Sequence, residues 1–242
     1  MGRGMEITRA NLASGAVLAF IREESMKAPK EYRPLSDGEL ARSLEDTLSD
    51  WDGHSDLWLF GYGSLIWNPA IRFKECRIAR LDGWHRRFCL WLRIGRGSKE
   101  NPGLMLALDQ GGSCRGVAFR IPAAEVRTEL PLVWVREMTT GSYLARWVTV
   151  QGEDGPFPAL TFVADRDHAR YAGPVCEDEA AALIAKAAGR LGSCASYLLS
   201  TADHLDALGL DDPHIERLAA RVRAIQGEAS GRHAADPTLP KI

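Results

Sequence analysis

The sequence lacks the spacings that identify a metal site or a disulfide framework. Its five cysteines form no C-x-x-C pair, and its six histidines show no H-x-x-x-H spacing. Structural zinc sites and disulfide-rich folds normally carry such spacings. We therefore expect no metal site, and we expect the cysteine thiols to be reduced.

Charge and hydropathy argue against two further classes of protein. Lys and Arg number 30 against 32 Asp and Glu, so the formal net charge is -2 and no basic surplus exists to neutralise nucleic-acid phosphates. No apolar run approaches the roughly 20 residues that span a bilayer. The first residues lack the apolar core and cleavage site of a signal peptide. We expect a cytoplasmic protein that binds neither nucleic acid nor membrane.

The chain of 242 residues is long enough for one well-buried core and an appendage. We divide it into an N-terminal helical extension (1–55), a main domain (56–226) and a flexible C-terminal tail (227–242). In the extension, the apolar spacing of residues 7–24 predicts a short helix. Ser36 and Glu39 have the spacing of a capping box, which predicts the start of a second helix.

The main domain begins with strands and ends with helices, so we predict an α+β fold. Short apolar or alternating runs separated by Gly, Asp, Asn and Pro favour a small, strongly bent β-sheet or barrel with flanking helices. These runs are 77–81, 87–92, 104–108, 114–121, 147–150 and 159–163. Asp109–Gly112 predicts a hairpin turn. Helical patterns cover 123–130, 177–190, 195–208 and 213–225.

A glycine-containing loop follows the first predicted strand. The apolar run Leu57–Phe60 breaks into Gly61-Tyr62-Gly63-Ser64-Leu65. Glycines allow backbone amides to approach a small polar molecule without interference from side chains, which would make a cradle for an anion or a zwitterion. The same pattern is also common in an ordinary turn or bulge, and this segment alone does not decide between the two.

One carboxylate lies in an apolar neighbourhood. Glu137 follows Val133-Trp134-Val135-Arg136 in the sequence. Burial would raise the pKa of this carboxyl, which suits a group that gains and loses a proton near neutral pH. A buried ion pair with Arg136, or a surface position at a helix end, is the structural alternative.

Several ordered motifs together resemble the ChaC-type γ-glutamylcyclotransferases. The segment 60–69 (FGYGSLIWNP) is similar to the family's opening motif, which contains Y-G-S-L. The similarity continues through 83–88, 96–97 with 102–103, 116–119, 135–143, 171–174 and the helix that carries Tyr197. It covers about Leu57 to Val222, and the N-terminal helices lie outside it.

The resemblance implies a specific reaction. In this family the free α-amino group of a γ-glutamyl compound attacks its own γ-carbonyl, which gives 5-oxoproline and releases the amine. The ChaC branch acts on glutathione and releases Cys-Gly. Because nucleophile and electrophile both belong to the substrate, the resemblance implies a small-molecule substrate and neither cofactor nor metal.

The resemblance also assigns roles to residues of the main domain, which it identifies as the catalytic domain. Glu137 matches the family's acid/base glutamate. The loop residues Gly61, Tyr62, Gly63, Ser64, Leu65 and Ile66 match its substrate-binding loop. Tyr143 and Tyr197 either contact the substrate through their hydroxyls or pack in the core. The sequence has no G-x-S-x-G elbow, which argues against Ser64 as a nucleophile.

One departure from the family pattern leaves the substrate open. The helix tyrosine is usually preceded by G-x-N-x-E, whereas this chain has Gly192-Ser193-Cys194-Ala195-Ser196. A cyclotransferase for another γ-glutamyl amine or dipeptide is therefore an alternative. A non-catalytic regulatory or binding protein of the same fold is a second alternative, because fold does not fix function. Protein partners cannot be predicted from the sequence.

Overall fold

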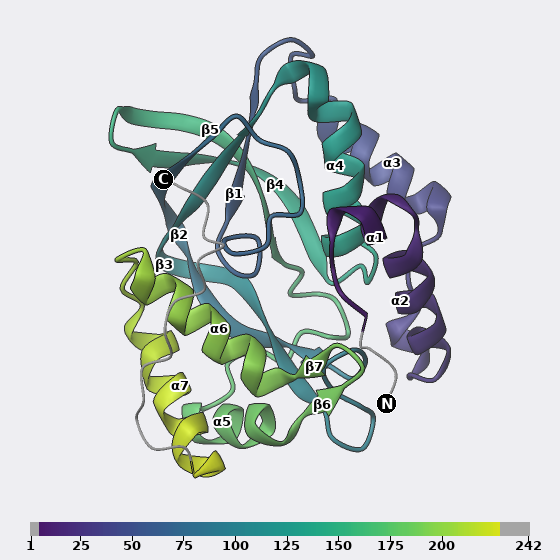
Figure 1. Ribbon diagram of the computed structural model, residues 1–242, viewed down its shortest axis with the longest axis vertical. Helices are drawn as coiled ribbons and strands as arrows, with labels where there is room; N and C mark the ends of the chain where they lie inside the picture. The colour runs from purple at the N-terminus through teal and green to yellow at the C-terminus, as the bar shows by residue number, and fades with distance from the viewer. Residues whose placement is uncertain (1–4, 228–242) are drawn as a thin grey trace.

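The computed structural model describes residues 5–227 and has a closed, five-stranded β-barrel at its centre (Figure 1). The strands are β1 (Leu57–Gly61), β2 (Glu75–Leu92), β3 (Gly103–Ile121), β4 (Tyr143–Gly152) and β5 (Gly155–Ala164). Their order around the barrel is β1-β3-β2-β4-β5, with antiparallel β1–β3, β2–β3 and β4–β5 pairs. A parallel contact between Leu59 of β1 and Leu160 of β5 closes the barrel. The predicted α+β class with a small barrel is confirmed.

Strands β2 and β3 are longer than the sequence predicted, and the hairpin turn expected at Asp109–Gly112 is wrong. Strand β3 runs straight through these residues, and the chain reverses instead between Leu92 and Gly103. Gly111 and Gly112 have positive φ angles (100° and 67°) and lie opposite a register shift in β2. Glycines with positive φ serve a bulge as readily as a turn, so the pattern was ambiguous.

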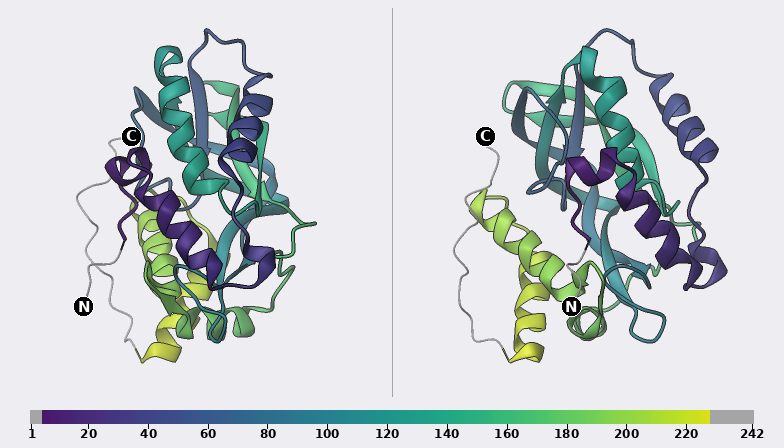
Figure 2. Two further views of the ribbon diagram at one scale, coloured as in Figure 1. Left: turned by 90° about the vertical axis from the view of Figure 1, so that its right-hand side faces the viewer. Right: turned by 45° about the vertical axis from the view of Figure 1, so that its right-hand side comes forward.

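Helices cover two sides of the barrel (Figure 2). They are α1 (Arg9–Ala13), α2 (Ala16–Met26), the 3₁₀ turn η1 (Lys30–Tyr32), α3 (Asp37–Leu48), α4 (Ala123–Glu137), α5 (Glu177–Lys186), α6 (Cys194–Ala207) and α7 (Pro213–Gln226). A two-stranded ribbon, β6 (Ala188–Gly189) and β7 (Gly192–Ser193), precedes α6. Helices α1 to α4 gather on one side of the barrel and α5 to α7 on the other.

Local sequence signals explain most helix starts. Ser36 and Glu39 form the predicted capping box at the start of α3, and the Asp212 side chain caps α7. The single helix predicted over residues 7–24 is wrong, because the chain breaks into α1 and α2 at Gly15, whose φ is 76°. Glycine accepts this left-handed conformation without steric cost. Of the predicted tail (227–242), only Gly227 lies within the described residues.

The barrel separates two hydrophobic cores. Successive residues of a strand point to opposite faces. Accordingly, Leu59 belongs to the core that includes residues of α3 and α4, whereas Phe60 belongs to the core that includes residues of α5, α6 and α7. Both side chains are fully buried. The loop that leaves β1 therefore emerges between the two cores. Within residues 5–227, no helix has the length and apolar character that a bilayer span requires.

Candidate active site

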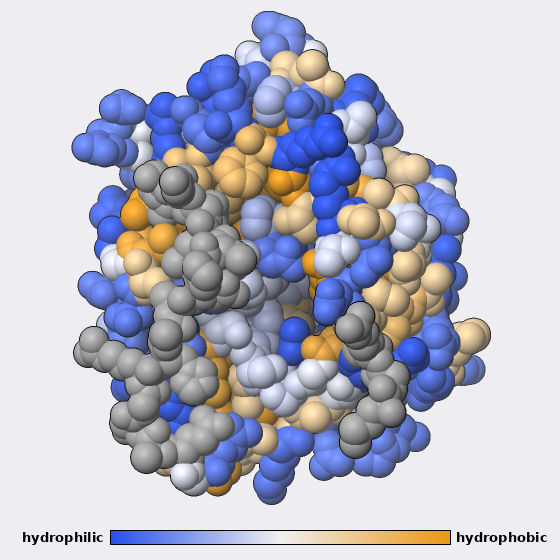
Figure 3. Space-filling model, in the orientation of Figure 1, coloured by the Kyte–Doolittle hydropathy of each residue, from blue (hydrophilic) through white to orange (hydrophobic). Residues whose placement is uncertain are grey.

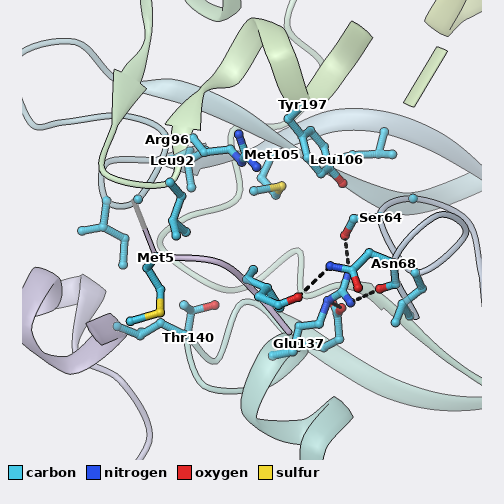
Figure 4. A pocket seen from close by; sticks show the side chains of 18 of the residues that line it. Met5, Ser64, Asn68, Leu92, Arg96, Met105, Leu106, Glu137, Thr140 and Tyr197 are labelled. Atoms are coloured by element: carbon cyan, nitrogen blue, oxygen red, sulfur yellow. Dashed lines mark hydrogen bonds and ion pairs between the residues drawn. The ribbon is translucent and has the colours of Figure 1, made fainter. Parts of the chain in front are cut away.

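A cavity of about 550 Å³ opens beside the end of β1. Figure 3 shows the surface hollowed near the middle of this face, and Figure 4 shows the side chains around the cavity. Its walls come from the loop after β1, the end of α4, the loop between β2 and β3, helix α6 and the N-terminal segment. Elements from the whole length of the chain therefore meet at one site.

Most of the predicted substrate loop lines this cavity. Tyr62, Gly63, Ser64 and Leu65 face it. A Cβ atom on Gly63 would lie 3.1 Å from the Tyr197 hydroxyl and 3.2 Å from the Leu106 side chain, so the backbone passes close to both. Glycine at this position leaves the main chain next to the cavity uncovered.

Gly61 and Ile66 lie outside the cavity lining. A Cβ atom on Gly61 would meet the Leu65 Cβ at 2.9 Å, so the glycine is required by packing within the loop. Ile66 is fully buried in the core on the α6 side of the barrel. These two members of the predicted set position the loop and do not face the space that a ligand would occupy.

A buried arginine of β2 holds the loop after β1 in place. Arg86 on β2 is 2% exposed, and its Nε donates a hydrogen bond of 2.6 Å to the carbonyl of Tyr62. The same guanidinium pairs with Asp212 at 3.1 Å and donates to the carbonyl of Arg115. A guanidinium with several fixed acceptors holds a backbone group precisely in place. Sequence reasoning did not identify this residue as part of the site.

Glu137 is the last residue of α4, and its side chain is 14% exposed at the wall of the cavity. Burial raises the pKa of its carboxyl above the ordinary value, and the nearby Arg136 guanidinium works against that shift. The Arg136 Nε lies 3.0 Å from Glu137 Oε1. The ion pair considered from the sequence therefore exists, yet burial outweighs it.

Arg136 also joins Glu137 to the loop after β1. Its Nη2 donates a hydrogen bond of 2.5 Å to Ser64 Oγ, and its Nη1 donates to the carbonyl of Asn68. One guanidinium thus sets the distance between the buried carboxyl and the glycine loop. Neither Arg136 nor Asn68 was predicted as a site residue, although the position of Arg136 next to Glu137 was a usable signal.

Three tyrosines surround this carboxyl. Tyr62, Tyr143 and Tyr197 line the cavity, and burial raises the pKa of each phenol, to about 12 for Tyr197. The charge of Glu137 adds to each shift. The phenols therefore stay protonated at neutral pH and can donate hydrogen bonds. The Tyr143 hydroxyl donates to the carbonyl of Leu106 at 2.8 Å.

A cation on the opposite wall was not predicted. Arg96, in the loop between β2 and β3, lines the cavity with its guanidinium 5.7 Å from the Tyr197 ring. Its Nη1 donates to the Ser193 carbonyl at 3.1 Å and to Ser196 Oγ at 3.2 Å. Ser193 and Ser196 belong to the stretch that departs from the family pattern. The departure therefore lies where this cation is held.

The N-terminal segment supplies another wall that the sequence did not reveal. Met5, Glu6, Ile7 and Thr8 line the cavity, as do Phe20, Ile21 and Glu24 of α2. Within residues 5–227, His, Cys, Asp and Glu side chains form no group of three that could hold a metal ion. The arrangement offers a buried carboxyl, neutral hydroxyl donors and an uncovered backbone, which together suit proton transfer on a bound polar molecule.

Comparisons with known proteins agree with this geometry. Residues 57–225 match the family model described as ChaC-like protein. The chain is 43% identical over 207 residues to the glutathione-specific gamma-glutamylcyclotransferase of Escherichia coli (strain K12), covering 85% of this chain and 87% of that protein. It is 35% identical over 174 residues to glutathione-specific gamma-glutamylcyclotransferase 1 of Homo sapiens, covering 70% and 78%.

The fold is also found in a solved structure. A crystal structure of the yeast gamma-glutamyl cyclotransferase specific to glutathione superposes with a TM-score of 0.66 at 21% identity, covering 74% of this chain and all of that one. At that identity the superposition shows a shared fold. The family match over residues 57–225, which include the whole barrel, and the 43% identity to the Escherichia coli protein show that the chain belongs to the ChaC-like family of γ-glutamylcyclotransferases.

Proposed function

We propose that this protein is a glutathione-specific γ-glutamylcyclotransferase that converts glutathione to 5-oxoproline and Cys-Gly. The observation that carries the proposal is Glu137, a largely buried carboxyl with a raised pKa on the wall of a cavity that the glycine loop also lines. Relatives that align with most of this chain are named for the same reaction on glutathione. The sections of chain that align include both the loop and Glu137.

The reaction needs a proton acceptor close to the substrate amine. A free α-amino group has a pKa of about 8 and is mostly protonated at neutral pH. The Glu137 carboxylate accepts a proton from this group, and the freed nitrogen attacks the γ-carbonyl carbon. A C–N bond forms, and the carbonyl oxygen takes up negative charge in the tetrahedral intermediate. The raised pKa makes the carboxylate a stronger base than an ordinary glutamate.

The same group then completes the cleavage. The protonated Glu137 delivers its proton to the amide nitrogen that joins the γ-carbonyl to cysteine. The C–N bond to that nitrogen breaks. The ring nitrogen, which kept two hydrogens on attack, gives its extra proton to the departing amine, so 5-oxoproline leaves as a neutral lactam and Cys-Gly as an ammonium ion. Protonation is required because an amide anion is a very poor leaving group, and general acid catalysis of this kind is typically worth roughly 10²- to 10⁴-fold. Glu137 ends the cycle ionised.

The surrounding groups bind and orient the substrate. The backbone of Tyr62–Ser64, held by Arg86 and Arg136, is the part of the cavity best placed to bind the γ-glutamyl group. The neutral hydroxyl of Tyr197 supplies a donor for a carboxylate or for the developing oxyanion, whereas the Tyr143 hydroxyl already donates to the Leu106 carbonyl. Fixing a flexible γ-glutamyl chain in its folded, reactive conformation accounts for much of the rate enhancement in such a reaction.

The test is to incubate the purified protein with glutathione and, separately, with γ-Glu-Ala, and to measure 5-oxoproline and Cys-Gly. We expect both products from glutathione, no product from γ-Glu-Ala and release by the Glu137→Gln variant that is at least about a hundredfold slower. Glu125→Gln is the matched control, because Glu125 lies in the first turn of the same helix and outside the cavity lining.

Other outcomes would redirect the proposal. Product from γ-Glu-Ala but not from glutathione would favour a cyclotransferase for another γ-glutamyl compound. Undiminished release by Glu137→Gln would contradict the acid/base assignment. Absence of product from either substrate would contradict the enzymatic proposal for glutathione and favour another γ-glutamyl amine or a binding role.

A further inference from the structure

The N-terminal segment forms one side of the cavity although it lies outside the matched family region. The family match begins at residue 57, yet Met5, Ile7, Phe20 and Ile21 line the cavity. In Figure 4, Met5 and Leu92 lie across the cavity from Ser64 and Asn68. The question is whether this wall merely covers the site or contacts the substrate.

The first attachment of this segment leads directly to the catalytic framework. The Asn68 side-chain amide donates a hydrogen bond of 2.7 Å to the carbonyl of Ile7. The carbonyl of the same Asn68 accepts a hydrogen bond from Arg136, which pairs with Glu137. A chain of three contacts thus links the N-terminal segment to the proposed acid/base group. These contacts fix the position of the segment relative to Glu137.

The second attachment is an ion pair with a buried carboxylate of α4. Glu129 is 1% exposed, and Arg9 binds both of its oxygens, at 2.5 Å and 3.2 Å. The Arg72 backbone amide donates to Glu129 at 3.0 Å. A buried carboxylate without a cation would be costly, so the main domain carries a group that needs the N-terminal segment. The segment is therefore a fixed part of the folded molecule.

The third attachment lies at the other end of the segment. Arg190, in the ribbon before α6, donates to Glu23 at 2.8 Å and to Glu24 at 3.0 Å, and its guanidinium lies 4.9 Å from the Phe20 ring. The neighbouring Leu191 lines the cavity with Phe20 and Glu24. The segment from Ile7 to Glu24 is therefore held across the cavity, from Asn68 and α4 on one side to the β6–β7 ribbon on the other.

From this arrangement we infer that residues 5–24 form the wall that binds the cysteinylglycine part of glutathione and so determine specificity beyond the γ-glutamyl group. The inference rests on the proposed function. The γ-carbonyl must lie beside Glu137 and the loop, so the remainder of the tripeptide extends through the cavity away from Ser64 and Asn68. Met5, Phe20 and Ile21 supply apolar surface there, beside the polar Glu6, Thr8 and Glu24, and this apolar part suits the cysteinyl side chain.

Two methionines of this segment provide a matched test. Met5 lines the cavity, whereas Met26 at the end of α2 is 81% exposed and lies outside this lining. We expect Met5→Ala to raise the KM for glutathione roughly tenfold, the scale set by lost apolar contacts in a substrate pocket, with kcat changed less than about twofold. Met26→Ala should leave both constants unchanged. Glutathione affinity, measured by calorimetry in the Glu137→Gln background, should fall in parallel with the change in KM.

A second pair of variants tests the attachment of α2 to the β6–β7 ribbon rather than the contact between Met5 and the substrate. Arg190→Ala removes the exposed clamp on α2, and Arg221→Ala removes a similarly exposed ion pair between α7 and α5. Surface ion pairs contribute little to stability, so both proteins should fold with similar thermal midpoints. Only Arg190→Ala should raise the KM for glutathione, by a few-fold.

The outcomes separate this inference from the proposed function. If the wild-type protein releases 5-oxoproline from glutathione and Met5→Ala and Arg190→Ala match their controls in KM and affinity, the inference is overturned and the function stands. An equal increase in KM for Met26→Ala would also overturn it. If the wild-type protein acts on neither glutathione nor any other γ-glutamyl compound, the function fails and the inference fails with it.

Discussion

Helix α4 carries one fully buried and one largely buried glutamate, and their pKa values shift in opposite directions. Glu129 in the middle of the helix is 1% exposed, and the Glu137 side chain at its end is 14% exposed. Burial by itself would raise the pKa of either carboxyl. For Glu129, hydrogen bonds from Arg9 and from the Arg72 backbone outweigh burial, and its pKa is lowered. For Glu137, burial prevails over Arg136, and its pKa is raised.

The difference lies in what surrounds each carboxyl. Two groups from elsewhere in the chain donate to Glu129, so its oxygens are held as a permanent carboxylate. The cation beside Glu137 is shared with Ser64 and Asn68, and the other neighbours are neutral phenols beside a cavity. Burial alone therefore does not make a carboxylate catalytic. What matters is whether the ionised form is fully satisfied by hydrogen bonds.

Replacing each of the two glutamates with glutamine should give the largest difference in turnover, which only the change at Glu137 should lower. Glu137→Gln should lower the rate of 5-oxoproline release by roughly 10²- to 10⁴-fold, or about 3 to 5 kcal/mol, because a proton carrier is removed. Glu129→Gln should leave the rate of the folded enzyme within a few-fold of the wild type. Initial rates at saturating glutathione measure this difference. Comparable losses in both variants would remove the distinction between the two carboxyls.

The free energy of unfolding should depend more on Glu129 than on Glu137. Glu129→Gln should lower the free energy of unfolding by about 1 to 2 kcal/mol at pH 7, because charge-assisted hydrogen bonds become neutral ones. The folded-state pKa of Glu129 is lowered, so its contribution is present above the unfolded pKa and is lost as the pH falls through the folded pKa. Urea unfolding at pH 7 and pH 4 should therefore show a difference that shrinks in acid. A difference that grows in acid would contradict the assigned shift.

The pH dependence of activity should report the raised pKa of Glu137 and the effect of Arg136 on it. Because the pKa of Glu137 is raised, kcat/KM should decline on the acid side at a pH above the ordinary glutamate pKa. Arg136 lowers this pKa, so Arg136→Met should move the acid limb to higher pH. Arg136→Lys keeps the charge and is the control for lost hydrogen bonds. An acid limb at the same pH in both variants would show that the cation does not set the pKa.

The smallest expected effect concerns the space between Gly63 and the Tyr197 hydroxyl. A Cβ on Gly63 would lie 3.1 Å from the Tyr197 hydroxyl, so Gly63→Ala should displace one of them by a few tenths of an ångström and raise KM a few-fold. Gly38→Ala is the control, since a Cβ there meets nothing within 4 Å and alanine favours the helix. Steady-state kinetics with glutathione measure both. An unchanged KM for Gly63→Ala would show that the loop tolerates the added methyl group.

Local signals in the sequence predicted much of the framework. The capping box at Ser36, the strands that contain residues 147–150 and 159–163, and the starts of the three helices after Cys176 all appear where residue patterns placed them. Such features depend on residues within one or two turns of each other, so a short window contains the determining contacts. The hairpin expected at Asp109 failed because the same glycines can make a turn or a bulge, and only the partner strand decides.

Local patterns predicted only part of the site. The sequence by itself determined the glycine loop and an ionisable group at Glu137, because each depends on neighbouring residues. It also determined the family, because the family's motifs occur in order along the chain. Tertiary structure alone decided that Arg136 links Ser64 to Glu137, that Arg9 satisfies Glu129 and that the N-terminal segment closes the cavity. A pKa depends on desolvation and on the distance to charges from distant parts of the chain. Those quantities are fixed only when the whole chain folds.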